Sequence, residues 1–473
     1  MMGHHDARAT GVLRLACAAQ FMVVLDVSVV NVALPSLRTD LGFDAVGLQW
    51  VVNGYALAFA GFLLLGGRLA DLYGRRRVLL AGLGLFTVAS LAGGLATAPG
   101  VLTAMRAVQG LGAAVLAPAT LTVLTTTFGE GPARTRALAV WSAVSSAGGA
   151  TGNLLGGILT DGLSWRWTLL INVPVGAIAA VAALRLLPAD RPATARRALD
   201  LPGAVLATGG VTALVWGMTQ AQRDGWTGPA TLTGLGGGAV LLTALVLVER
   251  RPSGNPLVPP RLVRLRPVWA GNAVMLVAGA CFIPMWYFLS LYMQEVLHYG
   301  ALATGLGFLP HTLGGIAGAR LASVLMGRFG ARALIVASSL LAAAGFLWQS
   351  RIAPGDSYLV GLFGPALVMS AGMGLLSTPI TTTVTSGAHP RDAGAASGLM
   401  NTTRQLGGAL GLAALVTVAA AHGTGSGAAL RPVFTVVAVL CVATAALACV
   451  LPSGGRAPAA VPAPSPAPAD EPT

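Results

Sequence analysis

The chain has 473 residues, of which 55% are hydrophobic, only 10% are charged and 63 are glycine. A soluble protein of this size needs more charge to cover its surface, so the composition excludes a soluble globular protein and indicates a polytopic membrane protein. The net charge of +13 arises from arginines that lie in short segments between apolar stretches, a placement that argues for membrane loops and against a nucleic-acid partner.

The apolar stretches are long enough to cross a bilayer as helices, because about 20 apolar residues span its hydrocarbon core. The predicted fold class is therefore an all-α integral membrane protein, and the stretches in chain order predict fourteen transmembrane helices. The predicted spans are 13–35, 46–67, 78–96, 101–124, 137–159, 168–187, 201–219, 230–248, 268–292, 303–326, 332–350, 358–384, 395–420 and 431–451.

Arginines in the connecting segments determine the predicted orientation. With the N-terminus in the cytoplasm, 21 of the 29 arginines fall in cytoplasmic segments and five in external ones. Adding or dropping one early span would destroy this asymmetry, so we predict that both ends of the chain are cytoplasmic.

The polar segments 188–200 and 249–267 flank the seventh and eighth spans, which look like an insertion between two six-helix halves. The predicted organisation is an N-terminal six-helix bundle over 1–187, an inserted two-helix segment with its flanking loops over 188–267, and a C-terminal six-helix bundle over 268–451. Residues 452–473 are rich in Pro and Ala and have no apolar period, so we expect a disordered cytoplasmic tail.

Several polar or glycine-rich motifs occur in order along the chain. They are Leu25–Pro35, Gly67–Arg77, Arg106–Ala114, the glycine ladder of span 137–159, Ser164–Trp167, Ile171–Pro174, Ala393–Gly398 and Arg404–Gly408. Together these motifs resemble the major facilitator superfamily, specifically its fourteen-span drug:proton antiporter family, over nearly the whole chain. The resemblance implies two six-helix bundles that export small molecules by alternating access.

Asp26 lies in the middle of the first predicted span, with apolar residues on both sides. A carboxylate at that depth costs at least about 2.5 kcal/mol on insertion scales, so it must face a cavity or a partner. Removal from water favours its protonated form, as a carrier of exchangeable protons requires. The alternative is a hydrogen-bonded packing residue. In the family that the chain resembles, this position is tied to coupling.

Arg106 is the second charge within a predicted span. At about 1.5 Å per residue it lies less than about 10 Å from the external end and Asp26 about 14 Å, so the two side chains are expected to meet directly or across water. The arginine stays charged and tunes the protonation of the carboxylate as the geometry changes, unless it extends outward to the lipid headgroups. We therefore predict that Asp26 and Arg106 couple transport to protons.

The segment between the second and third spans is predicted to be a cytoplasmic turn. Gly67 and Gly74 permit a tight reversal of the chain, and Asp71 is expected to cap a helix N-terminus or to pair with Arg75. These four residues are predicted to form a latch that holds the cytoplasmic side closed. The alternative is that the arginines only anchor the loop at the membrane surface.

Span 137–159 carries glycines four residues apart, a small-residue stripe that lets another helix approach closely. The stripe resembles the family's antiporter motif, except that Asn153 stands where a proline is usual, and this departure weakens the argument for export over import. The predicted motif residues are Gly148, Gly152, Asn153, Gly156 and Gly157.

An exporter of drug-like compounds needs a large apolar cavity with few polar groups. The side chains predicted to line it favour a small amphipathic or cationic substrate over a sugar, which needs many hydrogen-bonding partners. They are Asn31, Gln49, Asn53, Gln109, Asn272 and Met275.

These features predict a proton-coupled antiporter that exports drug-like or antibiotic molecules across the cell membrane and suffices as a monomer. We expect no cofactor or metal, because the sequence shows no nucleotide-binding motif and no Cys/His spacing typical of a metal site. A proton-coupled importer on the same fold is the first alternative. A membrane enzyme is the second, but the sequence offers neither a nucleophile–base pair nor a metal cluster near the membrane surface.

Overall fold

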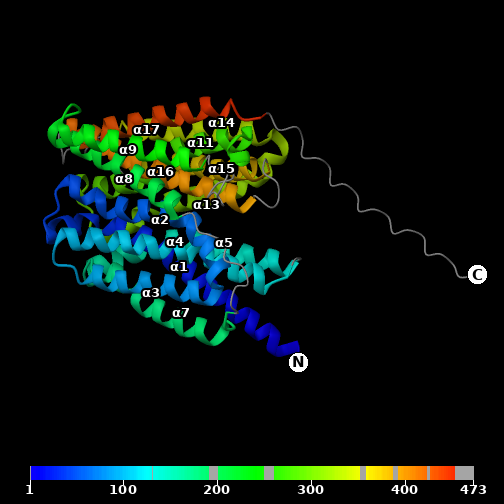
Figure 1. Ribbon diagram of the computed structural model, residues 1–473. Coiled ribbons are helices and arrows are strands. Elements are labelled where there is room, and N and C mark those ends of the chain that lie inside the picture. Colours follow the sequence, from blue (N-terminus) through cyan, green and yellow to red (C-terminus); the bar gives the residue numbers. More distant parts are fainter. Residues whose placement is uncertain are drawn as a thin grey trace, which may run out of the picture.

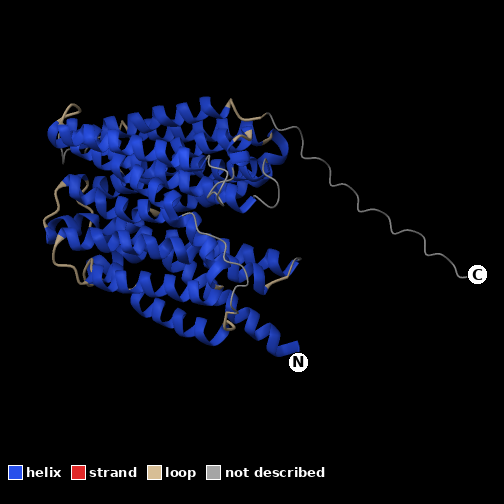
Figure 2. Cartoon of the chain, viewed as in Figure 1, coloured by secondary structure: helices blue, strands red, loops and turns tan. Residues whose placement is uncertain are grey.

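A computed structural model describes residues 2–129, 132–190, 201–249, 260–351, 358–386, 393–422 and 427–452. Every regular element in these ranges is a helix (Figure 2). The long helices run roughly parallel to one another in a single bundle (Figure 1). We call the end of the bundle at which α1 begins and α17 ends the terminal end, and the opposite end, where α1 ends and α2 begins, the distal end.

The first group of helices forms one side of the bundle. Within it α1 packs on α5, and α4 lies between α2 and α3, which in turn packs on α7. The group comprises α1 (Met2–Leu41), α2 (Ala45–Tyr73), α3 (Arg75–Gly94), α4 (Pro99–Thr127), α5 (Pro132–Gly162), α6 (Trp167–Leu170) and α7 (Asn172–Leu186).

The second group forms the other side of the bundle, with α11 against α16 and α15 between α13 and α14. It comprises α11 (Arg266–Leu291), the π-helix η1 (Tyr292–Val296), α12 (Ala301–Gly307), α13 (Leu309–Phe329), α14 (Ala331–Gln349), the π-helix η2 (Leu359–Phe363), α15 (Gly364–Ser386), α16 (Ala393–Ala421) and α17 (Gly427–Ala448).

Between the two groups in sequence lie α8 (Leu201–Asp224), α9 (Pro229–Glu249) and the short α10 (Pro260–Val263). The first two pack on each other, and α8 also lies against both α2 and α16. A small core of Leu57, Val211, Val215 and Ala409 fills the contact among these three helices. The pair therefore touches the first group and the second group at once.

Ten helices in the described ranges are long and apolar enough to cross a membrane, by length and composition. The predicted spans 46–67, 137–159, 201–219 and 303–326 coincide with α2, α5, α8 and the α12–α13 pair, whose described residues do not meet these criteria. The all-helical class agrees with the prediction, whereas the count of fourteen stays a prediction.

Two predicted spans are interrupted. Span 168–187 begins with one turn of helix, α6, and restarts at Asn172, and span 303–326 divides at Phe308 into α12 and α13. In the second case Pro310 lies in the first turn of α13, where proline is tolerated because its missing N–H has no partner within the helix.

The turns at Gly74 and Gly330 indicate that the two groups are built alike. Gly74 joins α2 to α3 with φ of 93°, and Gly330 joins α13 to α14 with φ of 80°. Only glycine adopts this backbone region readily. The same turn therefore occurs at the terminal end of both groups.

The hydrophobic core is shared at the distal end and divided at the terminal end. At the distal end one cluster joins both groups, for example Val29 and Leu34 of α1 with Phe288 of α11 and Phe434 of α17. Towards the terminal end two separate clusters occur, one around Phe86 and Leu116, the other around Val274 and Ile380. The groups are thus packed together most extensively at the distal end.

Candidate functional site

Asp26 on α1 is enclosed by polar side chains of neighbouring helices, and none of its surface is exposed (0%). Arg106 Nη1 donates to its Oδ2 at 2.5 Å. Gln109 Nε2 and Asn172 Nδ2 both donate to its Oδ1, at 2.7 Å and 2.8 Å. Both carboxylate oxygens therefore accept hydrogen bonds from donors on α4 and α7, and the buried charge has a paired cation.

Arg106 points into the first group of helices and does not extend to the protein surface, since it is only 2% exposed. Its Nε donates to the carbonyl oxygen of Val51 at 3.1 Å, and its Nη1 also donates to Gln109 Oε1 at 2.6 Å. The guanidinium lies 4.5 Å from the centre of the Tyr55 ring, an arrangement that adds cation–π attraction. Two helices, α2 and α4, thus hold the arginine against Asp26.

Helix periodicity explains how α4 supplies two of these partners. Residues three apart lie on the same helix face, so Arg106 and Gln109 both reach Asp26. Gln109 Nε2 also donates to Ser90 Oγ of α3 at 2.7 Å. Asp26, Ser90, Arg106, Gln109 and Asn172, which we call the carboxylate network, therefore join α1, α3, α4 and α7.

The sequence analysis singled out three members of the carboxylate network and missed the other two. Asn172 lies in a motif that was recognised, and its position at the start of a helix restarted after Ile171 is what turns its side chain inward. Ser90 is an ordinary small polar residue in an apolar helix, and no sequence signal distinguishes it from a serine that bonds only its own backbone.

Polar contacts at the distal end join the two groups of helices. Arg38 Nη1 of α1 lies 2.7 Å from Glu295 Oε1 of η1. Ser290 Oγ donates to the Asn31 carbonyl oxygen at 2.7 Å, and Gln294 Nε2 donates to the Val32 carbonyl oxygen at 2.9 Å. The distal end is therefore closed by hydrogen bonds as well as by the shared apolar core.

A second distal contact comes from Asp161 at the end of α5. Its two carboxylate oxygens accept from the backbone N–H groups of Ala301 and Leu302, at 3.1 Å and 2.7 Å, in the first turn of α12. A carboxylate in this position satisfies unpaired donors and complements the positive end of the helix dipole. We refer to Asp161, Arg38 and Glu295, with their partners, as the distal gate.

The glycines of α5 face α1 and α12. A Cβ added at Gly152 would lie 2.6 Å from Ser28 Cβ, and one added at Gly156 would lie 2.8 Å from the Val29 carbonyl oxygen. One added at Gly157 would lie 2.5 Å from the Ala301 carbonyl oxygen of α12, whereas Gly148 is somewhat less crowded, at 3.2 Å from the Phe21 carbonyl oxygen. The stripe thus brings α5 against the helix that carries Asp26.

Asn153 lies within the same stripe and is only 2% exposed. Its side-chain Oδ1 has no hydrogen-bond partner among the described residues. Its own carbonyl oxygen would lie 2.5 Å from a Cβ added at Gly305 of α12. The residue that replaces the family's usual proline is therefore at the contact between the two groups of helices.

The predicted latch is described only in part. Gly67 and Asp71 belong to α2, but their surroundings lie outside the described residues, and Arg75 is exposed at the start of α3. The carboxylate that caps α3 is Asp190, whose Oδ1 and Oδ2 accept from the backbone N–H groups of Arg76 at 3.1 Å and Arg77 at 2.8 Å. It lies directly against Gly74, where a Cβ would collide with it. Because Asp190 is more than a hundred residues from these partners, no local pattern in the sequence predicts this contact.

The predicted cavity residues do not come together in one described cavity. Gln109 belongs to the carboxylate network, and neither of the two cavities whose lining is described contains any of the six residues. The other five are buried, and three of them have amide atoms without a hydrogen-bond partner in the described part of the chain. These atoms are Nε2 and Oε1 of Gln49, Nδ2 of Asn53 and Oδ1 of Asn272. Met275 packs in the apolar core of the second group, and Asn31 Nδ2 bonds the Val27 carbonyl oxygen.

Comparison with known proteins places this geometry in a family. The Major Facilitator Superfamily model matches residues 16–412. The chain is 54% identical to a cephamycin export protein of Amycolatopsis lactamdurans, over 95% of this chain and 93% of that one. It is 43% identical to a puromycin resistance protein of Streptomyces alboniger, over 87% of this chain and 82% of that one.

The fold has a counterpart among solved structures. A crystal structure of a POT family transporter in complex with a thioalcohol-conjugated peptide superimposes with a TM-score of 0.68 and covers 93% of this chain and 95% of that one. Its 13% sequence identity makes this a likeness of fold alone. No cluster of potential metal ligands occurs among the described residues. The family match and the many apolar helices make the chain a multi-pass membrane transporter rather than an enzyme, and it belongs to the Major Facilitator Superfamily.

Proposed function

We propose that this protein exports small antibiotic molecules across the cell membrane in exchange for protons. The observation that carries the proposal is the carboxylate network: an acid buried beside an arginine inside a transporter whose relatives include a cephamycin export protein and a puromycin resistance protein. Ionisable residues within membrane helices are rare and mark proton or substrate pathways. Cephamycin is the first substrate to test, because the relative named for its export shares 54% of the sequence.

The topology that accompanies this proposal has fourteen spans and cytoplasmic ends. The domains are those of the sequence analysis, with bundles over 1–187 and 268–451, the inserted pair within 188–267 and a cytoplasmic tail from 452. Support for the four spans beyond the ten comes from α2, α5, α8 and α12–α13. These helices lie at the predicted positions, although their described residues fall short of the length and hydropathy expected of a span. The terminal end then faces the cytoplasm and the distal end faces outward.

The arrangement of the hydrophobic core supports alternating access, because the two groups share one cluster at the distal end and have separate clusters towards the terminal end. The distal gate and the shared core close the outward side, while the two groups keep separate cores towards the cytoplasm. Asp26 is fully enclosed in this conformation, so a proton reaches it only after the helices around it separate. Protonation removes the negative charge that pairs with Arg106 and weakens the contact between α1 and α4. Because α5 packs on α1 through glycines, α1 has room to slide when that contact weakens.

The substrate is bound between the two groups, with Gln49, Asn53 and Asn272 as its polar contacts and Asn31 and Met275 beside them. An unpaired buried amide costs about 1–3 kcal/mol, and such groups in a native protein call for a ligand or water that completes them. The latch of Gly67, Asp71, Gly74 and Arg75 closes the cytoplasmic side in the opposite conformation. The protein acts as a monomer and takes its energy from the proton gradient.

Everted membrane vesicles test direction and coupling together. Acidifying their interior should drive cephamycin inward, which corresponds to export from the cell, and a protonophore should abolish the uptake. Asp26→Asn should lose proton-driven uptake, whereas Asp224→Asn, at an exposed acid of α8, should behave as wild type. Substrate leaving the vesicles under the same gradient would identify an importer. Uptake that persists in Asp26→Asn would refute the role of this carboxylate.

A further inference from the structure

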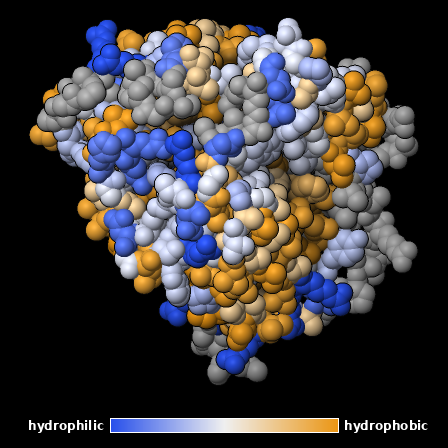
Figure 3. All heavy atoms as spheres, turned by 90° about the vertical axis from the view of Figure 1, so that its left-hand side faces the viewer, coloured by the Kyte–Doolittle hydropathy of each residue, from blue (hydrophilic) through white to orange (hydrophobic). Residues whose placement is uncertain are grey.

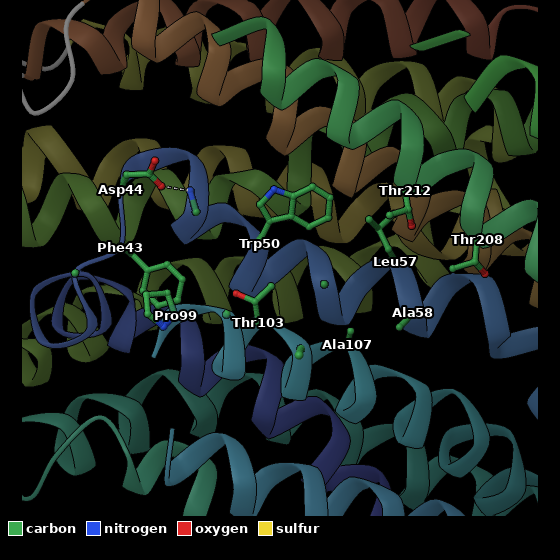
Figure 4. Close-up of a pocket in the computed structure, with 15 residues that line it drawn as sticks. Phe43, Asp44, Trp50, Leu57, Ala58, Pro99, Thr103, Ala107, Thr208 and Thr212 are labelled. Carbon is green, nitrogen blue, oxygen red and sulfur yellow. Dashed lines mark hydrogen bonds between the residues drawn. The ribbon is translucent and has the colours of Figure 1, made fainter. Parts of the chain in front are cut away.

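A groove of about 820 Å³ runs along α2 between α4 and α8 (Figure 4). At one end lie Phe43, Asp44 and Pro99, and at the other Ala58 and Thr208 (Figure 4). From Asp44 to Ala58, α2 advances about 20 Å at 1.5 Å per residue. The groove therefore extends from the distal surface to roughly the middle of the bundle.

The lining of the groove is largely apolar, with the hydroxyl groups of Thr103, Thr208 and Thr212 among its apolar side chains. Trp50 and Leu57 of α2 and Thr212 of α8 line the groove (Figure 4), and Ala104 and Ala107 form the side contributed by α4. Asp44 is the only charged residue among the described residues that line the groove. Its carboxylate Oδ1 accepts from the Gly47 N–H and caps α2. The largely apolar lining and the single charge at the distal mouth suit an occupant with a hydrocarbon chain and a polar group at its distal end.

The mouth carries two charges of opposite sign. One is the carboxylate of Asp44, and the other is the positive N-terminal end of α4, which begins at Pro99 after Ala98, a residue with no side chain able to cap it. Helix N-termini bind phosphate groups through their free N–H groups and their dipole. Gly100, in that first turn, has no atom within 4 Å of where a Cβ would stand, so the space beside these N–H groups is open.

We propose that this groove binds one acyl chain of a phosphatidylethanolamine molecule from the outer leaflet. The lipid phosphate lies at the N-terminus of α4, the lipid ammonium lies near Asp44, and the chain extends along Trp50 and Leu57 towards Thr208. The inference rests on the proposed orientation, in which the distal end faces outward. It does not depend on the direction or the energy source of transport.

The position of the groove links the bound lipid to the carboxylate network. Thr103 and Ala107, which line it, flank Arg106 on α4, and Trp50 precedes Val51, whose carbonyl oxygen bonds Arg106 Nε. The chain therefore rests on the outside of the same contact between α2 and α4 that holds Arg106 in place. It also fills the space between this contact and the inserted helix α8.

Photolabelling with the full-length protein in proteoliposomes tests the proposal. The probe is phosphatidylethanolamine with a diazirine midway along one acyl chain, and labelled residues are mapped by mass spectrometry. We expect label concentrated on groove residues of α2, α4 and α8. Gly100→Leu and Ala104→Leu should each reduce that label about tenfold, because the added side chain displaces methylene groups of the lipid from the groove.

The matched control is Gly84→Leu on α3, another exposed glycine with no atom within 4 Å of its missing Cβ. It should leave groove labelling unchanged, and size-exclusion chromatography should show all three variants to be folded. Label spread evenly over the lipid-facing helices, or undiminished in Gly100→Leu and Ala104→Leu, would overturn the site. Loss of label on adding cephamycin would assign the groove to the transported molecule instead. Equal labelling by the phosphatidylglycerol analogue would overturn the headgroup assignment.

Discussion

Gln49 and Asn53 lie one turn apart on α2 and are both buried, yet they leave three amide atoms without partners among the described residues. A buried, unsatisfied donor or acceptor costs about 1–3 kcal/mol of stability. A residue that served packing alone would be more stable as leucine at such a position. The presence of these buried amides therefore favours contact with a ligand. A substitution that removes an amide should then raise stability and weaken transport.

Gln49→Leu is accordingly expected to raise the melting temperature of the purified protein, since it removes two unpaired groups at once, and to weaken antibiotic transport. Gln349→Leu is the control: this glutamine is also fully buried, but it has one unpaired atom and one bond to the Gly361 carbonyl oxygen. It should leave the KM for transport unchanged. A Gln49→Leu protein that is less stable and transports normally would contradict the prediction.

The sequence predicted members of the carboxylate network where a residue type is energetically unfavourable in its surroundings. Asp26 and Arg106 were found because a charge inside an apolar span demands a partner. Asn172 and Ser90 were not, because a neutral polar side chain carries little penalty when it bonds its own helix. Only the packing of α7 and α3 brings Asn172 to Asp26 and Ser90 to Gln109. The distal pair Arg38 and Glu295 likewise joins residues that no local pattern relates.

Among the helices, the contact between α1 and α5 gives the sharpest test. A Cβ at Gly152 would stand 2.6 Å from Ser28 Cβ, closer than real carbon atoms approach, whereas one at Gly149 would meet nothing nearer than 3.8 Å. Gly152→Ala should therefore push the helices apart at a cost of about 1–3 kcal/mol, the range measured for overpacked cores. Gly149→Ala should be close to neutral. Thermal unfolding and antibiotic transport would be measured for both variants. Equal effects of the two alanines would show that the glycine stripe does not determine how closely α1 and α5 pack.

Helix positions could be predicted from the length of apolar stretches, but the breaks within them could not. The single turn of α6 before Asn172 lies in a span whose hydropathy stays high, so no window of apolar residues reveals that break. The π-helices η1 and η2, which continue α11 and precede α15, were not predicted either. Turn glycines were a better guide: Gly74 was singled out, and its φ of 93° shows why glycine is needed there.

Across the whole molecule, the two groups meet through a surface that is polar at the distal face and apolar beneath it. In Figure 3, which looks at the distal end, hydrophilic side chains lie beside broad areas of hydrophobic atoms. The apolar cluster of α1, α11 and α17 holds the two groups together but does not specify how they align, because hydrophobic contact is favourable in any register. The distal gate adds hydrogen bonds and an ion pair between specific residues of the two groups. These contacts are few, so each can be removed by a single substitution.

The components of the distal gate should differ in strength. Arg38 and Glu295 are partly exposed, at 37% and 25% of their side chains, and an exposed ion pair is worth only about 0–1 kcal/mol. Asp161 accepts two backbone N–H groups at a helix terminus, and hydrogen bonds to charged groups contribute about 1.5–3 kcal/mol. Opening at the distal end should therefore respond more to Asp161 than to Glu295.

Spin labels at the exposed positions Thr39 and His298, one on each side of the distal end, would report this opening as a longer distance. Because 1.4 kcal/mol corresponds to tenfold in an equilibrium constant, Glu295→Gln should raise the ratio of open to closed molecules by no more than about fivefold, and Asp161→Ala by about tenfold or more. The full effect of Asp161→Ala should persist at high salt, while that of Glu295→Gln should fade as ions screen the native pair. A larger shift for Glu295→Gln than for Asp161→Ala would mean that α12 does not depend on this carboxylate, and that closure of the distal end rests on the apolar core and the ion pair alone.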